Sequence, residues 1–229
     1  VNGTESPEWK YVRDVAPLFP YDPVEWGNQF PKLPGIMDLN SSNITCGRNA
    51  FDWAAKPETA DVLAGSEVGF RISEDGAGKY GHFYDPGSGQ VYLSRAPRDD
   101  LEHYQGDGDW FKIAYGGPVT NDKWLLWQQP EFNFTIPATT PPGKYLLRLE
   151  QFMPTTEPNY VQWYVDCAHV NIIGPGGGTP TKFARFPGTY VVDQPGLLIP
   201  ADQYLSTRTR EGGYKLLDYQ PPGPALWSG

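Results

Sequence analysis

The sequence Pro-Pro-Gly-Lys-Tyr-Leu-Leu-Arg-Leu-Glu at residues 141–150 decides the fold class. Its Pro-Pro-Gly turn signal is followed by strand-forming residues over 145–152. A second and longer apolar segment covers residues 161–173. Because successive side chains of a strand point to opposite faces, Cys167 and Tyr164 are expected on different faces of this segment. The stretch therefore predicts two long β-strands.

Shorter strand candidates lie on both sides of this pair in the chain. The 26 Gly and 24 Pro supply many turns between short strands, a composition typical of a β-sandwich. No long helix is predicted, and only residues 99–103 begin a helical turn. The chain is short enough to form a single domain over 1–229. The shorter strand candidates cover residues 68–72, 91–93, 110–114 and 132–136.

Three segments read as long loops, at residues 14–38, 73–90 and 197–229. Loops of this length are usually either functional or disordered. Aromatic residues are scarce in disordered segments, whereas the first and last of these loops are rich in them. We therefore expect functional surfaces there.

The charge of the chain narrows the class of ligand. Its formal net charge is −9 with only 18 Lys and Arg, whereas nucleic-acid binding needs a basic surface. An acidic, aromatic-rich protein suits a neutral polysaccharide, although acidity also serves solubility alone. No apolar run reaches the roughly 18 residues of a membrane span. No signal peptide is present, as expected of a mature chain.

The cysteines and glycosylation sequons predict a secreted protein. Cys46 and Cys167 are the only cysteines, and we expect one disulfide formed in an oxidising compartment. The alternative is two buried free thiols. Several N-glycosylation sequons in so short a chain favour the extracellular reading. They begin at Asn2, Asn40, Asn43 and Asn133.

The three histidines show no metal-binding spacing. His169 lies within a core strand and is expected to be packed or hydrogen-bonded. His103 follows acidic residues and is expected to face solvent. His82, in the Gly-rich loop, is the one histidine that we consider for a function.

Motifs for other chemistries are absent or unspecific. There is no Gly-x-Ser-x-Gly elbow, and no phosphate-loop or dinucleotide fingerprint. The 27 acidic residues leave a two-carboxylate glycoside hydrolase open, but no spacing singles out a pair.

Several motifs in order resemble a known family. The segments 141–196 and 221–229, the strand Gly-Gln-Val-Tyr-Leu at 89–93 and Trp-Phe-Lys-Ile at 110–113 resemble the AA9 lytic polysaccharide monooxygenases, formerly family 61 glycoside hydrolases. The resemblance implies an immunoglobulin or fibronectin III-like antiparallel β-sandwich with long loops. It also implies a secreted fungal monomer whose partner is cellulose, xylan or an oligosaccharide of either.

The copper site of that family transfers only in part. Family members hold copper with the amino group and side chain of an N-terminal histidine, a second histidine and an axial tyrosine. Tyr164 matches the axial tyrosine, and Gln162 matches a glutamine beside it. Where the family has its second histidine, this chain has Gly87–Ser88, and where the family has a further histidine beside the site, this chain has a position near Thr155. Val1 aligns several residues after the family's first histidine. Because copper at such sites needs nitrogen donors, we expect no copper, no other metal and no cofactor.

The resulting expectation is a secreted AA9-like protein that binds plant cell-wall polysaccharide in an accessory role in lignocellulose degradation. The alternative is an active copper-dependent monooxygenase with an atypical site. A two-carboxylate hydrolase and a protein-interaction role also remain. Aromatic rings stack on sugar faces, although the same rings can instead pack their own loops. The candidate sugar contacts are Tyr21, Trp26, Tyr204, Tyr214 and Tyr219.

Overall fold

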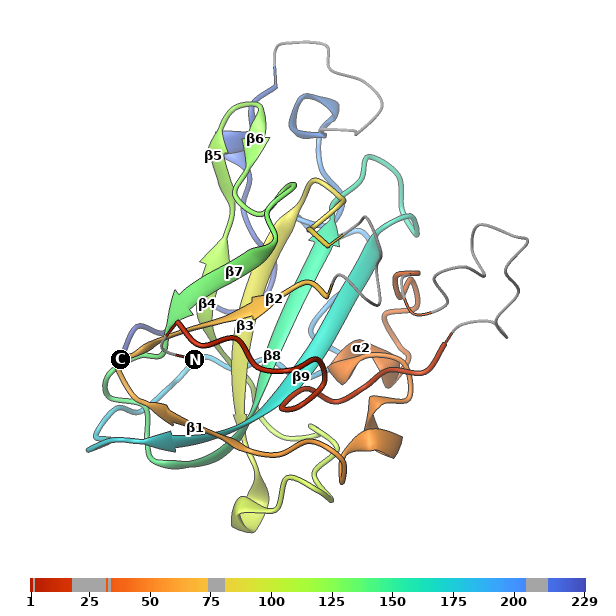
Figure 1. Cartoon of the computed structure of the whole chain (residues 1–229). Coiled ribbons are helices and arrows are strands. Elements are labelled where there is room, and N and C mark those ends of the chain that lie inside the picture. The colour runs from red at the N-terminus through yellow and green to blue at the C-terminus, as the bar shows by residue number, and fades with distance from the viewer. Residues whose placement is uncertain (2, 18–31, 33, 74–80, 205–213) are drawn as a thin grey trace.

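The main layer of the protein is a mixed five-stranded β-sheet. The structure, a computed structural model, describes residues 1, 3–17, 32, 34–73, 81–204 and 214–229. The strand order is β1-β9-β8-β3-β4, with β1 parallel to β9 and every other neighbouring pair antiparallel (Figure 1). The strands are β1 (Ala60–Leu63), β3 (Ser88–Arg95), β4 (Phe111–Gly116), β8 (Gly143–Met153) and β9 (Gln162–Ile173).

A second, smaller layer covers one face of this sheet. It consists of the antiparallel pair β2 (Glu67–Arg71) and β7 (Glu131–Thr135), which lies in front of the main sheet in Figure 1. Phe132 and Phe134 of β7 alternate with exposed residues and point into the core between the layers. A separate short hairpin joins β5 (Pro118–Thr120) and β6 (Lys123–Trp124). The predicted β-sandwich is therefore confirmed.

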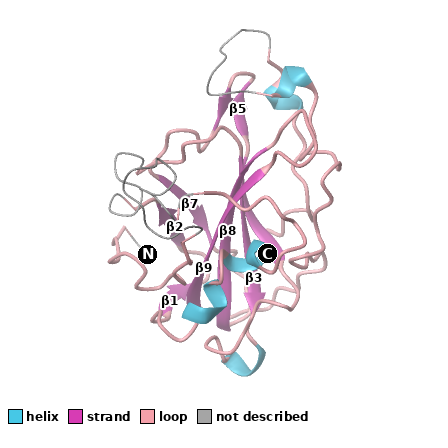
Figure 2. Cartoon of the chain, turned by 90° about the vertical axis from the view of Figure 1, so that its right-hand side faces the viewer, coloured by secondary structure: helices cyan, strands magenta, loops and turns pink. Residues whose placement is uncertain are grey.

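Loops and short helices cover the other face of the main sheet (Figure 2). Helix α2 (Asn43–Cys46) is tied to β9 by the disulfide between Cys46 and Cys167, whose Cα atoms are 5.0 Å apart. The predicted disulfide is confirmed, and the alternative of two free thiols is wrong. The 3₁₀ helices are η1 (Ala50–Trp53), η3 (Pro97–Asp99), η4 (Ala201–Gln203) and η5 (Leu216–Asp218).

The predicted strands all form, with shifted boundaries. The loop predicted over 73–90 ends earlier, because residues 88–90 already pair with β8. The helical turn expected at 99–103 is a 3₁₀ turn at Pro97–Asp99, where proline fixes the first residue. Strands β1, β5 and β6 were not predicted, since each is too short to show a period. Among the described residues, no helix has the length and apolar character needed to cross a bilayer.

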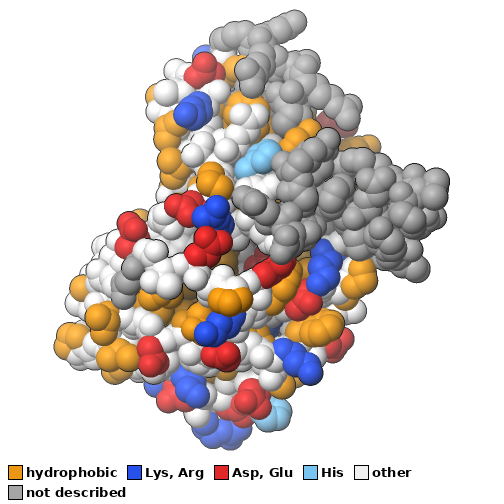
Figure 3. Space-filling view, in the orientation of Figure 1, with side chains coloured by type: hydrophobic (Ala, Val, Ile, Leu, Met, Phe, Trp, Pro, Cys, Tyr) orange, Lys and Arg blue, Asp and Glu red, His pale blue; other side chains and the backbone are white. Residues whose placement is uncertain are grey.

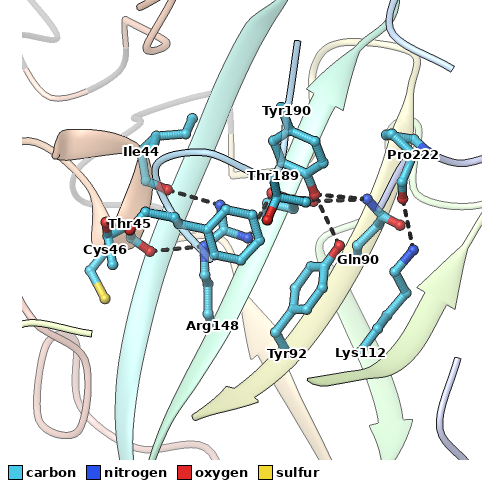
Figure 4. A network of polar contacts seen from close by, with 12 residues as sticks. Ile44, Thr45, Cys46, Gln90, Tyr92, Lys112, Arg148, Thr189, Tyr190 and Pro222 are labelled. Carbon is cyan, nitrogen blue, oxygen red and sulfur yellow. Dashed lines mark hydrogen bonds and ion pairs between the residues drawn. The ribbon is translucent and has the colours of Figure 1, made fainter. Parts of the chain in front are cut away.

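A buried polar network lies between the sheet and the covering loops (Figure 4). The carboxylate of Glu150 accepts hydrogen bonds from Arg148, Gln90 and Tyr190. Arg148 also donates to the carbonyl oxygens of Thr45 and Ile44, at 2.8 and 2.9 Å. These bonds satisfy charges that burial would otherwise penalise, and they fix the covering segments to β8.

Candidate functional site

The candidate site lies where β9 begins and presents the hydroxyl of Tyr164. This hydroxyl is 2.8 Å from Oδ2 of Asp85 and 3.0 Å from Oε1 of Gln162. A phenol has one hydrogen, and the carboxylate is the stronger acceptor, so Tyr164 donates to Asp85. The amide oxygen of Gln162 is a second acceptor within reach of the same hydroxyl. The structure therefore joins Tyr164 and Gln162 as one hydrogen-bonded unit and adds Asp85.

The loop carrying Asp85 is held in place from both sides. Nε2 of Gln151 in β8 donates to the carbonyl oxygen of Asp85 at 3.1 Å. Phe83 is buried, and its backbone exchanges hydrogen bonds with Gln128 and Gln129 at 2.8 and 2.9 Å. The apolar ring and the backbone bonds thus position the carboxylate against Tyr164.

Burial keeps the phenol of this unit protonated. Burial raises the pKa of Tyr164 far above its usual value, and the negative charge of Asp85 raises it further. Burial also raises the pKa of Asp85, although the hydrogen bond from Tyr164 opposes that shift. At neutral pH, Tyr164 is therefore a neutral hydrogen-bond donor.

The positions that the resemblance aligns with imidazoles are Gly87, Ser88 and Thr155. A Cβ atom at Gly87 would overlap the carbonyl group of Phe152. Ser88 is fully buried at the start of β3, and Thr155 is buried with its N–H bonded to the carbonyl of Leu197. A side chain at Gly87 would therefore require movement of the backbone.

The donor atoms of the described residues do not form a copper site by themselves. They contain no group of three or more His, Cys, Asp and Glu side chains that could hold a metal. Tyr164, Asp85 and Gln162 offer oxygen atoms, whereas copper of this kind prefers imidazole nitrogen. The described donor set by itself does not fit copper, so we derive no reaction step through the metal.

The three histidines occupy three different environments. His169 is 1% exposed, and its Nε2 accepts a 2.9 Å bond from Nε of Arg13, as expected for a packed histidine. Burial, with the charge of Arg13, lowers the pKa of His169 to about 3. His103 faces solvent and contacts Asp100 at 3.0 Å, also as expected. His82 shares the loop of Asp85, with its ring 6.3 Å from that of Tyr84.

The tyrosine and tryptophan residues predicted to contact sugar differ in their burial. Tyr204 and Tyr214 are partly buried against a small cluster around Trp124. Tyr219 is 4% exposed, stacks edge-on to Trp124 at 4.9 Å and donates to the carbonyl of Gly196. Its expected role is therefore corrected: Tyr219 packs its own loop. Tyr21 and Trp26 lie outside the described residues.

Sequence reasoning missed three residues near Tyr164. Asp85 stands in an Asp-Pro-Gly turn directly before a strand, and that turn was the available signal. Tyr84 and Tyr160 are 53% and 60% exposed and precede β3 and β9, the strands that start beside the site. Burial cannot be read from single loop residues, so these rings gave no signal.

A small crevice beside Tyr164 holds an unusual carboxylate. The crevice, of about 60 Å³, is lined by Asp166, Arg48 and Lys32 among others. Burial raises the pKa of Asp166 to about 7, while the positive charge of Arg48 opposes the shift. Arg48 in turn donates to the carbonyl oxygens of Ala16, Lys32 and Pro34. The crevice therefore links β9 to the N-terminal loop.

Both fold and site define a class of protein. The two-layer β-sandwich has the fold of the solved structure of HiLPMO9B, with a TM-score of 0.65, 23% identity and coverage of 86% of this chain and 84% of that chain. A sequence model of Auxiliary Activity family 9 (formerly GH61) matches residues 1–210, and the chain belongs to this family.

Individual relatives agree with this assignment. The chain is 66% identical over 231 residues to "AA9 family lytic polysaccharide monooxygenase U" of Thermothielavioides terrestris, covering 100% of this chain and 90% of the relative. It is 35% identical to "AA9 family lytic polysaccharide monooxygenase C" of Emericella nidulans, covering 100% and 88%. A cellulose-active polysaccharide monooxygenase from M. thermophila has the same fold, with a TM-score of 0.65, 20% identity and coverage of 87% and 86%.

Family membership corrects the expectation that the protein uses no cofactor. That expectation is wrong, because the AA9 family consists of copper-dependent monooxygenases. The expectation rested on the absence of histidines at the positions aligned with the family's copper ligands. Members of the family are secreted fungal proteins that act on polysaccharides.

Proposed function

We propose that this protein is a copper-dependent lytic polysaccharide monooxygenase with an atypical site. The observation that carries the proposal is the 66% identity, over the whole chain, to a relative named as an AA9 monooxygenase. When bound, copper supplies the oxidative chemistry of the family. The residues of this chain that face the site are Tyr164, Gln162 and Asp85, which orient one another by hydrogen bonds.

The finer part of the proposal is that the usual histidine brace is lacking. Gly87 and Ser88 occupy the second imidazole position, and Gly87 has no room for a side chain. All three histidines of the sequence are described, and only His82 shares the loop of Asp85. We propose that nitrogen donors, where copper binds, are arranged differently from those of the other family members.

The substrate is proposed to be cellulose or xylan. Exposed rings support this, since aromatic side chains stack on the apolar faces of sugars. Tyr84 and Tyr160 are exposed and lie near the starts of β3 and β9, and Tyr204 and Tyr214 are partly buried rings of the C-terminal segment. Acidic and basic side chains intermix over the described part of the face in Figure 3, with no basic stripe for a polyanion.

The cellular context is proposed from the same observations. We propose a secreted monomer that forms one domain over 1–229. Asn40 and Asn133 are exposed and open to N-glycosylation, and Asn43 lies at the start of α2. Asn2 lies outside the described residues.

A second candidate function is polysaccharide binding without oxidation, in an accessory role. The bond between Tyr164 and Asp85 favours it, because a phenol that donates to a buried carboxylate is a weak metal ligand.

Copper titration and product analysis distinguish the two candidates. The mature protein is titrated with Cu(II) by calorimetry and then incubated with cellulose or xylan and a reductant. Stoichiometric binding with oxidised sugar products supports the monooxygenase. Glycan binding without oxidised sugar products supports the accessory role instead. Tyr164→Phe is compared with Tyr11→Phe, a half-buried tyrosine next to Val12, which pairs with the middle of β9.

A further inference from the structure

A second hollow lies at the other end of the main sheet from Tyr164. Its volume is about 380 Å³, within the range of roughly 300–1,000 Å³ typical of ligand pockets. Tyr145 in its lining and Gln151, which pairs with Tyr164, are six residues apart on β8. At about 3.3 Å per residue, the two places are roughly 20 Å apart. No residue of the candidate site lines this pocket.

Aromatic and proline side chains form the apolar part of the pocket. Phe111 and Tyr145 are buried and meet edge to face at 6.3 Å, and Trp227 supports Phe111 at 5.1 Å. Phe183 is 48% exposed in the lining, in contrast to the two buried rings. The buried rings form a rigid base, and Phe183 offers an open face for stacking.

Arg95 is held in the pocket by three neighbours. One terminal amino group donates to Asp99 at 3.2 Å, and the guanidinium lies 5.5 Å from the ring centre of Tyr145. A Cβ atom at Gly143 would overlap the guanidinium in this position, and the φ of +137° at Gly143 favours glycine. The guanidinium has five N–H donors, and its contacts with Asp99 and the hydroxyl of Tyr145 use only part of that capacity. Arg95 is therefore a positioned donor with unused capacity.

Asp109 supplies an acceptor in the same pocket. Its Oδ1 accepts bonds from Nε and a terminal amino group of Arg185, at 2.9 and 2.8 Å. Within the described residues its Oδ2 accepts none. The backbone carbonyl of Asp109 is fixed by the hydroxyl of Ser94 at 2.8 Å. A pocket with a held donor, a held acceptor and an open ring can bind a ligand that has both hydroxyls and an apolar face.

We propose that this pocket is a second carbohydrate-binding site, which takes a neutral sugar ring of a β-linked glycan. The ring face stacks on Phe183, while adjacent hydroxyls bond to Arg95 and Asp109. An anionic ligand is disfavoured by Asp109 and by the net charge of −9. The site goes beyond the proposed oxidative function and needs no metal, so binding alone tests it.

The test uses cellohexaose and the intact chain. Titration followed by protein NMR is expected to shift the amide signals of Phe183 and Asp109 separately from those around Tyr164. Phe183→Ala is expected to weaken the affinity at this pocket about tenfold or more. The control is Phe51→Ala, a phenylalanine 41% exposed in η1, which leaves the affinity unchanged. Parallel sedimentation with insoluble cellulose shows whether free oligosaccharide or polymer is the ligand.

A second pair of variants distinguishes the loss of a pocket residue from the loss of an ion pair beside the pocket. Asp109→Asn and Arg185→Gln break the same ion pair, but only Asp109 lines the pocket. Asp109→Asn is expected to weaken binding, and Arg185→Gln is not. Equal affinity of Phe183→Ala, Asp109→Asn and the unmodified protein would overturn the proposal. If cellohexaose shifts the signals of Phe183 and Asp109 but not those near Tyr164, the result counts against the proposed substrate of the Tyr164 site. It does not count against the second binding site proposed for this pocket.

Discussion

The guanidinium of Arg148 and the carboxylate of Glu150 lie 2.6 Å apart, and neither side chain has any exposed surface. Both belong to β8 and point to the face covered by loops, where Tyr190 and Gln90 complete the bonds of Glu150. The guanidinium also lies 3.8 Å from the ring centre of Phe186. A buried pair of this kind attaches the covering segments to the sheet, and its value depends on both partners being present.

Glu150→Gln is expected to lower the free energy of unfolding by about 3–5 kcal/mol, because the buried charge of Arg148 loses its partner. Urea denaturation followed by fluorescence measures the change. The double variant Arg148→Met, Glu150→Leu is expected to lose less than the sum of the two single variants. Additive losses would contradict a coupled pair.

Removal of the disulfide is expected to cost about 4–5 kcal/mol in the chain-entropy model, since Cys46 and Cys167 are 121 residues apart. The variant Cys46→Ala, Cys167→Ala is compared with the oxidised protein by denaturant unfolding. An unchanged midpoint would show that the covering loops hold α2 against β9 without the bond.

The stability of the protein is expected to depend on Asp166. Burial raises the pKa of Asp166 to about 7 from 3.8, so the folded state holds its proton more tightly than the unfolded state. The resulting stabilisation is fully present below about pH 4 and is lost as the pH rises towards 7. Asp166→Asn is expected to remove this part of the decline in unfolding free energy. The exposed Asp52→Asn serves as control, and an identical pH profile for both variants would contradict the assignment.

Asp85→Asn is expected to lower the pKa of Tyr164, because the variant removes a negative charge 2.8 Å from the phenol oxygen. Burial is the larger cause, so the pKa stays above that of a free tyrosine. NMR of tyrosine labelled at Cζ, with Tyr164→Phe for assignment, follows the titration. A titration of Tyr164 that Asp85→Asn leaves unchanged would show that the carboxylate does not control the phenol.

Local sequence pattern was enough to predict the longer strands but not the site. Residues 145–152 and 161–173 have the composition and alternation of strands, and they form β8 and β9. Asp85 could not be linked to Tyr164 from sequence, because 79 residues separate them and only the packing of the loop on Gln151 brings them together. Tyr219 and Tyr160 looked alike in the sequence, yet one is 4% and the other 60% exposed.

The sequence by itself determined the sandwich and the family, because alternation, turn residues and ordered motifs are local properties of the chain. Tertiary structure alone decided that Tyr164 is bound to Asp85, that Gly87 has no space for a side chain, and that a second pocket forms beside Arg95. The physical reason is that segments distant in sequence pack against each side chain. This packing sets the pKa of the side chain, the free volume around it and its exposure to solvent.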